Sequence, residues 1–319
     1  MKAAVYYQTG DPSVFRFEDV PDPVCHPRGI VVQVEAISIE GGDVLHRAGG
    51  ELMSRPHIVG YQCAGTILEA GDQVSDRAPG QRVVVTTPHG SHAERISVPA
   101  GSSWLVPDGM DIRDAACIPI AFGTADDCLF EFGHLAAGET VLIQGGAGGV
   151  GLAAIQLAKR AGATVLATAS SDEKLARLRE FGLDHGINYR ERDFVPAVRE
   201  VTDGRGVDLV VDPVGTTLPE SIACLAYRGR AITVGNAGRG DRMIDVRTLT
   251  TGNQSLTGVY LGAEMGTDRV HTMIARLIDD IASGTLTVII DRTFPLAEAA
   301  AAHAYIESRQ AFGRVVLVP

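Results

Sequence analysis

Residues 140–151 read Thr-Val-Leu-Ile-Gln-Gly-Gly-Ala-Gly-Gly-Val-Gly, and this stretch decides the fold. It begins as an apolar strand and continues into the spacing G-x-G-x-x-G at Gly146, Gly148 and Gly151. One glycine makes a tight turn, the next lets the backbone approach a pyrophosphate, and the third lets a helix pack against the strand. A glycine-rich turn without a ligand is the alternative, but its position between a strand and a helix favours a dinucleotide site. We therefore expect cofactor contacts from Gly146, Ala147, Gly148, Gly149, Val150 and Gly151.

The chain around and after this stretch alternates between strand and helix patterns. Residues 150–161 and 172–181 predict helices, and three nearly continuous apolar runs predict strands at residues 164–168, 207–212 and 231–235. Such runs are typical of strands covered on both faces. The alternation therefore predicts an α/β fold with a doubly wound parallel sheet. The last part adds a strand, two helices and a closing strand, at residues 256–261, 270–282, 297–307 and 314–318.

Residues 1 to about 118 show a different sequence pattern, in which short β-like segments are separated by glycine and proline. The clearest are residues 30–39, 58–68, 82–87 and 93–98. Short segments bounded by turn residues predict compact, largely antiparallel β structure. We expect the closing strand of the chain to return and pair with this region.

The end of the second strand in the α/β part decides between NAD and NADP. NAD-binding proteins usually carry an acid there, on the ribose hydroxyls, whereas this strand ends in small polar residues. Asp172 and Glu173 follow, but Ser170 and Glu173 have the spacing of a helix capping box. Lys174 is one of only three lysines and suits a 2′-phosphate, although a solvated lysine on a helix face is the alternative. We favour NADP(H) and expect three residues beside its adenosine part: Ser170, Lys174 and Tyr189.

The composition disfavours several classes of partner. The 319-residue chain carries a net charge of −11, which disfavours nucleic acid and anionic membranes. No apolar run approaches the ~18 residues of a membrane span, and the N-terminus has no signal-peptide pattern. Five cysteines without a Cys-x-x-Cys pair indicate a reducing compartment. We therefore expect a cytoplasmic protein without nucleic-acid or membrane partners.

The order and spacing of several motifs resemble the quinone oxidoreductase (zeta-crystallin-like) branch of the medium-chain dehydrogenase/reductase superfamily. The resemblance covers essentially the whole chain, at residues 1–3, 42–49, 60–65, 79–83, 145–151, 211–215, 294–296 and 312–317. It implies a GroES-like, mainly β catalytic domain formed by residues 1–120 and 264–319, with a Rossmann NADP-binding domain at residues 121–263. It also implies an active site between the domains and a homodimer joined through the Rossmann domains. On the family pattern, five residues lie near the cofactor: Thr124, Gly235, Asn236, Tyr260 and Arg314.

The same resemblance argues against zinc. Zinc-dependent relatives place a Cys and a His in stretches that here read Glu-Gly-Gly-Asp at residues 40–43 and Gly-Tyr-Gln at residues 60–62. The four-cysteine lobe is missing, and no Cys/His cluster has zinc spacing, with His89 and His92 the closest histidine pair. We therefore expect no metal.

Many family members have Asn-Tyr or Asn-Pro at residues 40–41 and Glu at residue 62. This chain differs at these positions, so a simple quinone specificity does not follow. Gly41 leaves more room in the cleft than a tyrosine would.

Hydride transfer to an enone or a quinone builds negative charge on the carbonyl oxygen. Without a Lewis acid, that charge needs hydrogen-bond donors. Tyr61 is the leading candidate, because it occupies a position where zinc relatives place a ligand; simple packing is the alternative. Asp43 either orients a neighbour in the cleft or pairs with Arg47 one helical turn on. Thr124 either touches the nicotinamide side or caps a helix, and it completes the predicted catalytic set.

Three functions compete on the sequence alone. The favoured one is a zinc-independent, NADPH-dependent reductase that transfers hydride to a quinone or an α,β-unsaturated carbonyl compound. The second is an enoyl-thioester reductase of the same superfamily, which predicts a basic entry patch that an acidic chain does not indicate. The third is a non-catalytic NADPH-binding protein, because fold and motif do not by themselves establish turnover.

Overall fold

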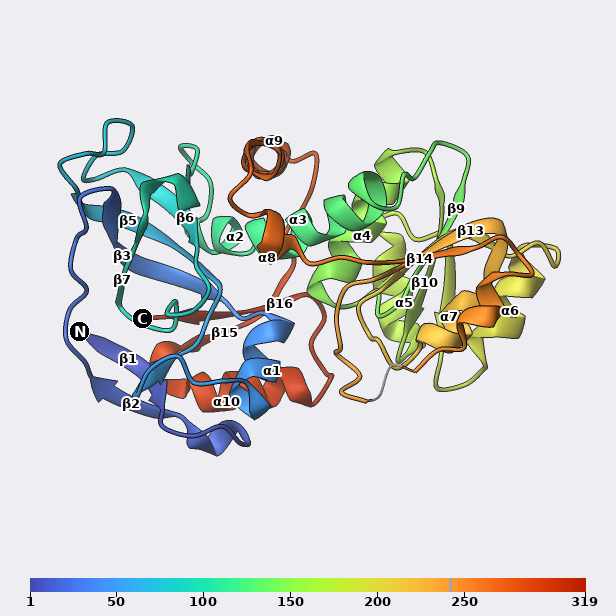
Figure 1. Ribbon diagram of the computed structural model, residues 1–319, viewed down its shortest axis with the longest axis horizontal. Helices are drawn as coiled ribbons and strands as arrows, with labels where there is room; N and C mark the ends of the chain where they lie inside the picture. The colour runs from blue at the N-terminus through green and yellow to red at the C-terminus, as the bar shows by residue number, and fades with distance from the viewer. Residues whose placement is uncertain (241–242) are drawn as a thin grey trace. The chain divides into compact units, whose positions relative to one another are not determined.

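The structure of the protein is a computed structural model that describes residues 1–240 and 243–319. The chain divides into two compact units. Met1–Gly123 and Gly262–Pro319 form the first unit, so both termini belong to it, and Thr124–Leu261 forms the second (Figure 1). The predicted α/β fold is confirmed, because the second unit contains a doubly wound parallel sheet.

The sheet of the second unit has the strand order β11-β10-β9-β12-β13-β14 in the described part of the chain, and all its pairs are parallel. Its strands are β9 (Thr140–Ile143), β10 (Thr164–Ala169), β11 (His185–Asn188), β12 (Val207–Asp212), β13 (Leu225–Thr233) and β14 (Ser255–Gly258). The helices of this unit include α4 (Gly149–Arg160), α5 (Asp172–Arg179), α6 (Phe194–Val201) and α7 (Leu218–Ala223). Strand order reverses between β9 and β12, and ligands of open parallel sheets bind at such a switch point, outside the carboxyl ends of the strands.

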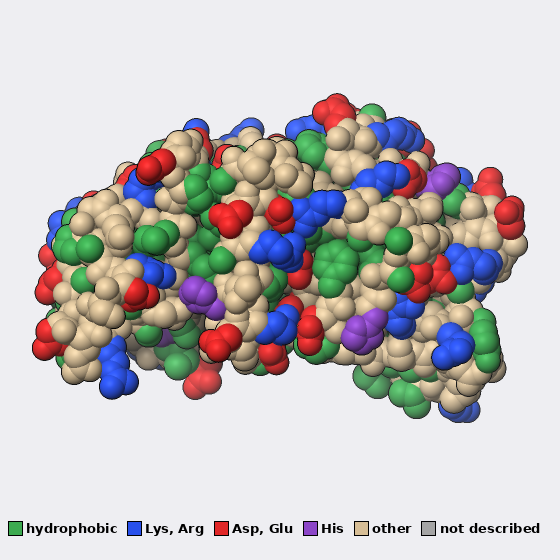
Figure 2. All heavy atoms as spheres, turned by 90° about the horizontal axis from the view of Figure 1, so that it is seen from above, with side chains coloured by type: hydrophobic (Ala, Val, Ile, Leu, Met, Phe, Trp, Pro, Cys, Tyr) green, Lys and Arg blue, Asp and Glu red, His purple; other side chains and the backbone are tan. Residues whose placement is uncertain are grey.

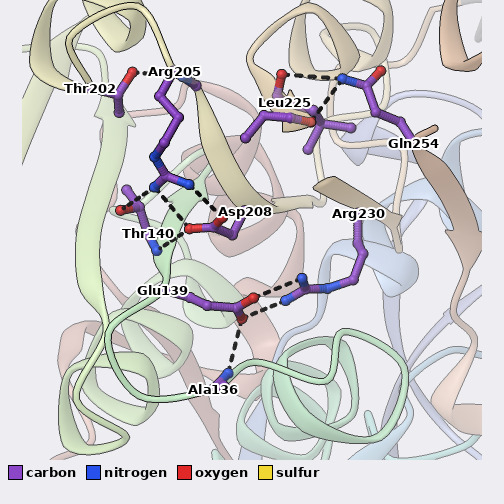
Figure 3. A network of polar contacts seen from close by, with 11 residues as sticks. Ala136, Glu139, Thr140, Thr202, Arg205, Asp208, Leu225, Arg230 and Gln254 are labelled. Atoms are coloured by element: carbon purple, nitrogen blue, oxygen red, sulfur yellow. Dashed lines mark hydrogen bonds and ion pairs between the residues drawn. The ribbon is translucent and has the colours of Figure 1, made fainter. Parts of the chain in front are cut away.

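At the opposite side of this sheet, its amino edge, where the strands begin, ion pairs connect neighbouring segments (Figure 3). Arg230 donates two hydrogen bonds to the Glu139 carboxylate, at 2.9 and 2.6 Å. Arg205 donates to both oxygens of Asp208, at 2.6 and 3.0 Å, and the Thr140 amide donates to the same carboxylate at 2.8 Å. Thr140 begins β9 and Asp208 lies near the start of β12. The charged side chains therefore stabilise one edge and leave the carboxyl edge for a ligand.

The first unit contains two sheets built from both ends of the chain. The larger has the order β15-β16-β3-β5-β6-β8 with β7 also paired to β3, and the smaller has the order β2-β1-β4. The strands are β1 (Lys2–Tyr6), β2 (Arg16–Asp19), β3 (Gly29–Ser38), β4 (His57–Ile58), β5 (Gln62–Ala70), β6 (Arg82–Thr86), β7 (Arg95–Pro99), β8 (Ser103–Leu105), β15 (Ile290–Pro295) and β16 (Arg314–Val318). As expected, the closing strand returns: β16 pairs antiparallel with β3, with Val316 opposite Ser38.

Short helices cover or connect these strands. They are α1 (Gly41–Gly49), α2 (Ile112–Ala116), α9 (Asp268–Ala282) and α10 (Ala299–Glu307), with α3 (Pro119–Asp126) and α8 (Leu261–Glu264) at the two passages between the units. The core of the larger sheet consists of fully buried aliphatic side chains such as Ile30, Val32, Ile67 and Val83. This core holds the start of α1 beside β5 and β16, where the polar residues described below meet.

The strand predicted at residues 58–68 is wrong in one respect, because the chain leaves extended pairing after Ile58 and resumes at Gln62. Gly60 causes the break. Its φ is +116°, and a Cβ there would lie 1.9 Å from the Ser91 hydroxyl oxygen. Only a glycine satisfies both the backbone conformation and the close approach. The interruption also places Tyr61 outside the regular sheet.

The surface carries charges of both signs. Acidic and basic side chains are interspersed over the face seen in Figure 2. Among the described residues, no helix combines the length and the apolar character that crossing a bilayer requires.

Candidate functional site

The glycine-rich turn joins β9 to α4 at the switch point of the sheet. Gly145 has a φ of +63°, and the Gly146 amide donates to the Thr168 carbonyl at 2.8 Å. A Cβ on Gly151 would lie 2.4 Å from the Gly145 carbonyl oxygen and 2.7 Å from the Gly146 Cα. The first turn of α4 therefore packs against the backbone of the turn as closely as two main chains can.

This packing leaves unused amides at the start of α4. Leu152 is the first residue of the helix whose amide bonds within it, to the Gly148 carbonyl at 2.9 Å. The amides of Gly149, Val150 and Gly151 precede it and have no acceptor in the helix. Gly148, which caps the helix, is exposed and has no side chain to bond them. The turn therefore fits an anionic group such as a pyrophosphate, which these amides and the helix dipole would stabilise.

Three predicted adenosine contacts lie around the end of β10. Ser170 follows directly after Ala169, and the Tyr189 amide donates to the Ala169 carbonyl at 3.1 Å. Ser171, and not Ser170, caps α5, because its hydroxyl accepts from the Lys174 amide at 3.3 Å. The capping role suggested for Ser170 is therefore wrong by one residue. Contacts of Ser170, Lys174 and Tyr189 with a cofactor stay predictions.

Four more residues of the second unit were predicted to lie near the cofactor. Gly235 and Asn236 follow β13, Tyr260 follows β14, and Thr124 is buried in α3. Gly235 is held against the neighbouring turn, since a Cβ on it would lie 2.7 Å from the Pro213 carbonyl oxygen. The side-chain oxygen of Asn236 is buried and has no hydrogen-bond partner among the described residues. Tyr260 is 77% exposed. An unpartnered buried acceptor at the carboxyl edge is suited to a donor from a ligand.

In the first unit, Tyr61 lies over the start of α1. A Cβ on Gly42 would lie 2.4 Å from Cε2 of the Tyr61 ring and 3.1 Å from its hydroxyl oxygen. Gly42 is therefore required for the ring to reach this position. Gly41 is exposed, and a Cβ there would meet no atom within 4 Å, so the room expected at this position is present.

Asp43 serves the same helix end. Its side chain is fully buried, and one carboxylate oxygen accepts from the Glu40 amide at 2.8 Å. Arg47 donates to the Glu307 carboxylate and to the Gly10 carbonyl. The predicted pairing of Asp43 with Arg47 is therefore wrong, because the arginine points to the C-terminal helix α10. Burial raises the pKa of Asp43 well above its ordinary value.

Arg314 forms a buried polar cluster with residues of β3 and β5 and with Glu40, the N-cap residue of α1. Its guanidinium donates to the Ser38 hydroxyl at 2.6 Å and to the Glu40 carboxylate. Gln62 donates to the same carboxylate at 2.5 Å and accepts from the Ile120 amide at 3.0 Å. The donors of Arg314 are thus engaged within the first unit, and its predicted approach to a cofactor gains no support from these contacts. The cluster connects α1, β5 and the start of α3.

Comparison with known proteins places this geometry in a family. Residues 26–108 match the family model described as alcohol dehydrogenase GroES-like domain, and residues 149–279 match the one described as zinc-binding dehydrogenase. A 2-haloacrylate reductase from Burkholderia sp is 35% identical over 99% of this chain and 98% of its own length. A quinone oxidoreductase from Pseudomonas aeruginosa is 32% identical over 97% of each chain. The chain belongs to the quinone oxidoreductase branch of the medium-chain dehydrogenase/reductase superfamily.

A solved structure of this quinone oxidoreductase branch supports the same assignment. The Escherichia coli quinone oxidoreductase, complexed with NADPH, matches the whole of both chains with a TM-score of 0.96 and 28% sequence identity. The GroES-like and Rossmann folds expected from the sequence are thereby confirmed.

Zinc, which one family model names, does not fit the residues present. Glu40 belongs to the stretch in which we expected zinc-dependent relatives to carry a ligand, and its carboxylate is bonded to Gln62 and Arg314. His89 and His92 contact different residues. The centroid of the His89 ring lies 5.4 Å from that of His57, whereas His92 Nε2 lies 3.2 Å from His303 Nε2. Within residues 1–240 and 243–319, no group of three or more His, Cys, Asp or Glu is arranged to hold a metal ion. Zinc-independence remains a prediction for experiment.

Sequence reasoning missed four buried polar residues beside the glycine turn. Gln144, Thr168, Asp212 and Ser221 are each at most 2% exposed and bonded to one another. Asp212 alone carried a signal in the sequence, because an acid that ends an apolar parallel strand lies at the carboxyl edge where ligands bind.

The buried histidines of the first unit make stability depend on pH. His57 is fully buried, neither ring nitrogen has a hydrogen-bond partner among the described residues, and its ring stacks on His46 at 4.8 Å. Burial, with His46 and His89 beside it, lowers the pKa of His57 from 6.5 to about 4. Between these values the unfolded chain binds a proton that the folded chain does not, so acid favours unfolding.

We therefore predict that His57→Phe flattens the pH dependence of the unfolding free energy. Between pH 6.5 and about 4, the wild type loses ~1.4 kcal/mol more per pH unit than the variant. Urea unfolding over this range measures the difference, and His26→Phe at an exposed position is the control. Parallel curves for wild type and His57→Phe would show that His57 does not titrate as described.

Proposed function

We propose that this chain is a zinc-independent, NADPH-dependent reductase that transfers hydride to a quinone or an α,β-unsaturated carbonyl compound. The observation that carries the proposal is the glycine turn at the carboxyl edge of a parallel sheet, which leaves the first three amides of α4 without an acceptor in the helix. The relatives named quinone oxidoreductase and 2-haloacrylate reductase support these two substrate classes. The NADPH complex of the Escherichia coli quinone oxidoreductase supports the cofactor.

The chain's own residues have distinct roles in this proposal. The amides of Gly149, Val150 and Gly151 bind the pyrophosphate, and Ser170 with Lys174 binds the 2′-phosphate. Bound NADPH supplies the hydride, and the protein contributes position and polarity. Tyr61 donates a hydrogen bond to the carbonyl oxygen as negative charge develops there.

One assay tests the function as a whole. NADPH absorbance is followed with a panel of quinones, small enones and enoyl thioesters, before and after treatment with a chelator. Turnover of quinones or enones that survives the chelator is expected. Turnover of enoyl thioesters alone would favour the second function, and NADPH binding without turnover of any compound would favour the third. Loss of activity with the chelator would contradict zinc-independence.

Lys174→Ala is expected to reduce the preference for NADPH over NADH. Loss of a charge-assisted bond to the 2′-phosphate weakens NADPH binding by about 10- to 100-fold and leaves NADH binding nearly unchanged. Dissociation constants for both reduced dinucleotides measure this ratio. Lys159→Ala is the matched control, because Lys159 lies in the same unit and pairs with Asp184 at 2.6 Å. An unchanged ratio in Lys174→Ala would remove Lys174 from cofactor recognition.

Tyr61→Phe is expected to lower kcat by about 10- to 100-fold, because a hydrogen-bond donor to the developing oxyanion is lost. The dissociation constant of NADPH should not change, since Tyr61 lies in the first unit and the phosphate-binding amides lie in the second. Steady-state kinetics and a binding titration separate the two effects. Tyr7→Phe, at an exposed tyrosine bonded to Glu18, is the control. Unchanged turnover in Tyr61→Phe would leave only a packing role.

The homodimer and the cytoplasmic location inferred from the sequence belong to this proposal as well. Light scattering on the purified protein is expected to give the mass of two chains. A monomer at micromolar concentration would contradict the homodimer and leave the proposed reaction untouched.

A further inference from the structure

A chain of buried hydrogen bonds crosses the carboxyl ends of three strands in the second unit. The Gly145 amide donates to the Thr168 hydroxyl at 3.1 Å, and that hydroxyl donates to the Gln144 side-chain oxygen at 2.7 Å. The Gln144 amide group donates to the Ser221 hydroxyl at 3.1 Å, which in turn donates to the Asp212 carboxylate at 2.8 Å. The chain therefore connects the first amide of the glycine turn to a carboxylate at the end of β12.

The direction of this chain is fixed by its two ends. The Gly145 amide can only donate, and an ionised Asp212 carboxylate can only accept. Gln144, Thr168 and Ser221 can each donate and accept, so they take the one direction that satisfies both ends. None of the four side chains is more than 2% exposed, so bulk solvent does not reach them and a reversed or broken link is costly.

Asp212 also orders the turn that follows β12. Its second oxygen accepts from the amides of Val214 and Gly215, each at 2.9 Å. The Val214 side chain lies 3.5 Å from the position of a Cβ on Gly145, and the Val214 carbonyl accepts from the Gly238 amide at 2.8 Å. One carboxylate thus supports the glycine turn, the turn after β12 and the loop after β13.

We propose that Asp212 is a positioning residue of the dinucleotide site, which sets the orientation of the Gly145 peptide and of the unused amides that follow it. It acts through Ser221, Gln144 and Thr168 and touches no cofactor itself. The inference rests on the proposed binding of NADPH.

The chain's direction makes the proposal testable with nearly isosteric variants. In Asp212→Asn, an amide donor replaces the oxygen that accepts from Ser221, so Ser221 receives two donors and its own proton has no acceptor in the chain. Turning the Gln144 amide only transfers the conflict to Thr168. In Gln144→Glu, two carboxylates compete for the single proton of Ser221, and a second negative charge is buried.

Combining the two substitutions removes both conflicts. In Asp212→Asn/Gln144→Glu, the Gly145 amide donates to Thr168, Thr168 and Ser221 both donate to the carboxylate at residue 144, and the amide at residue 212 donates to Ser221. The four groups of the chain all have partners again, and one negative charge is retained. Only the half-buried Thr217 hydroxyl, which donates to Asp212 at 2.9 Å, must turn to another acceptor. The double variant should therefore bind NADPH better than either single variant.

Two readouts distinguish positioning from a general loss of structure. Each single substitution is expected to raise the dissociation constant of NADPH by about tenfold or more, and to accelerate hydrogen exchange of the Gly145 amide in the free protein. The double variant is expected to return both quantities to within about threefold of wild type. Asp208→Asn makes the same chemical change at the amino end of β12 and should alter neither.

Additive effects of the two substitutions on the logarithm of the dissociation constant would overturn the proposal, since independent sites add. Unchanged NADPH affinity in Asp212→Asn would overturn it as well, whatever the melting temperature. If the wild type bound no NADPH, the proposed function would fail, whereas exchange of the Gly145 amide in the three variants would still decide whether the chain holds the turn.

Discussion

Gly151→Ala is expected to raise the dissociation constant of NADPH by about 100-fold or more, which corresponds to ~2.7 kcal/mol. The added Cβ would lie 2.4 Å from the Gly145 carbonyl oxygen and 2.7 Å from the Gly146 Cα. Both neighbours are backbone atoms, so neither yields by a side-chain rotation. The start of α4 must move away from the turn, and the amides that bind the pyrophosphate move with it. Fluorescence titration with NADPH measures the loss.

Gly101→Ala is the control for this prediction. A Cβ on Gly101 meets no atom within 4 Å, and its φ is not positive, so the substitution should affect neither folding nor binding. Binding by Gly151→Ala within threefold of wild type would show that the turn tolerates a displaced helix. In that event the close packing of α4 would not be what orients the amides.

Arg314→Leu is expected to destabilise the protein by ~3–5 kcal/mol, because it leaves the Glu40 carboxylate buried without its cation. Burial already raises the pKa of Glu40 although Arg314, Gln62 and Ser38 donate to its carboxylate. The cost of desolvating the charge therefore exceeds the stabilisation that these donors provide. Removal of the strongest donor increases that imbalance. Urea unfolding at pH 7 measures the change in the free energy of unfolding.

The matched double variant Glu40→Leu/Arg314→Leu is expected to be more stable than Arg314→Leu alone, since no uncompensated charge remains. Arg113→Leu provides the surface control. Arg113 pairs with Asp111 at an exposed position, where such a pair contributes ~0–1 kcal/mol. Equal losses for Arg113→Leu and Arg314→Leu would contradict the account of a buried ion pair.

Patterns within the sequence predicted strands of both units closely. The strand at residues 207–212 and the closing strand at residues 314–318 have the bounds of β12 and β16. Each is a largely apolar run with a glycine before it and a proline after it. Such a pattern can be recognised without reference to residues far away in the sequence. The glycine spacing likewise predicted the turn between β9 and α4, because each glycine answers a local steric demand.

Predictions that depended on the partner of a polar side chain were less successful. Asp43 and Arg47 have the spacing of a helical pair, yet Arg47 bonds to Glu307, 260 residues further along the chain. Arg314 likewise meets Glu40, which is 274 residues away, and its approach to the cofactor stays a prediction. A long cationic side chain pairs with a carboxylate that tertiary packing brings within reach. Spacing along the sequence says little about which carboxylate that is.

The sequence by itself determined the alternation of strands and helices, the glycine turn and the family resemblance, since these follow from local sterics and periodicity. Only the tertiary structure decided that Gln144, Thr168, Asp212 and Ser221 form one directed hydrogen-bond chain beneath that turn. Gln144 and Ser221 are 77 residues apart. They meet because Gln144 follows β9, and Ser221 lies in α7, which follows β12, the neighbour of β9 in the sheet. Hydrogen bonds act over about 3 Å in space whatever the separation along the chain, so strand order, and not sequence order, assigns their partners.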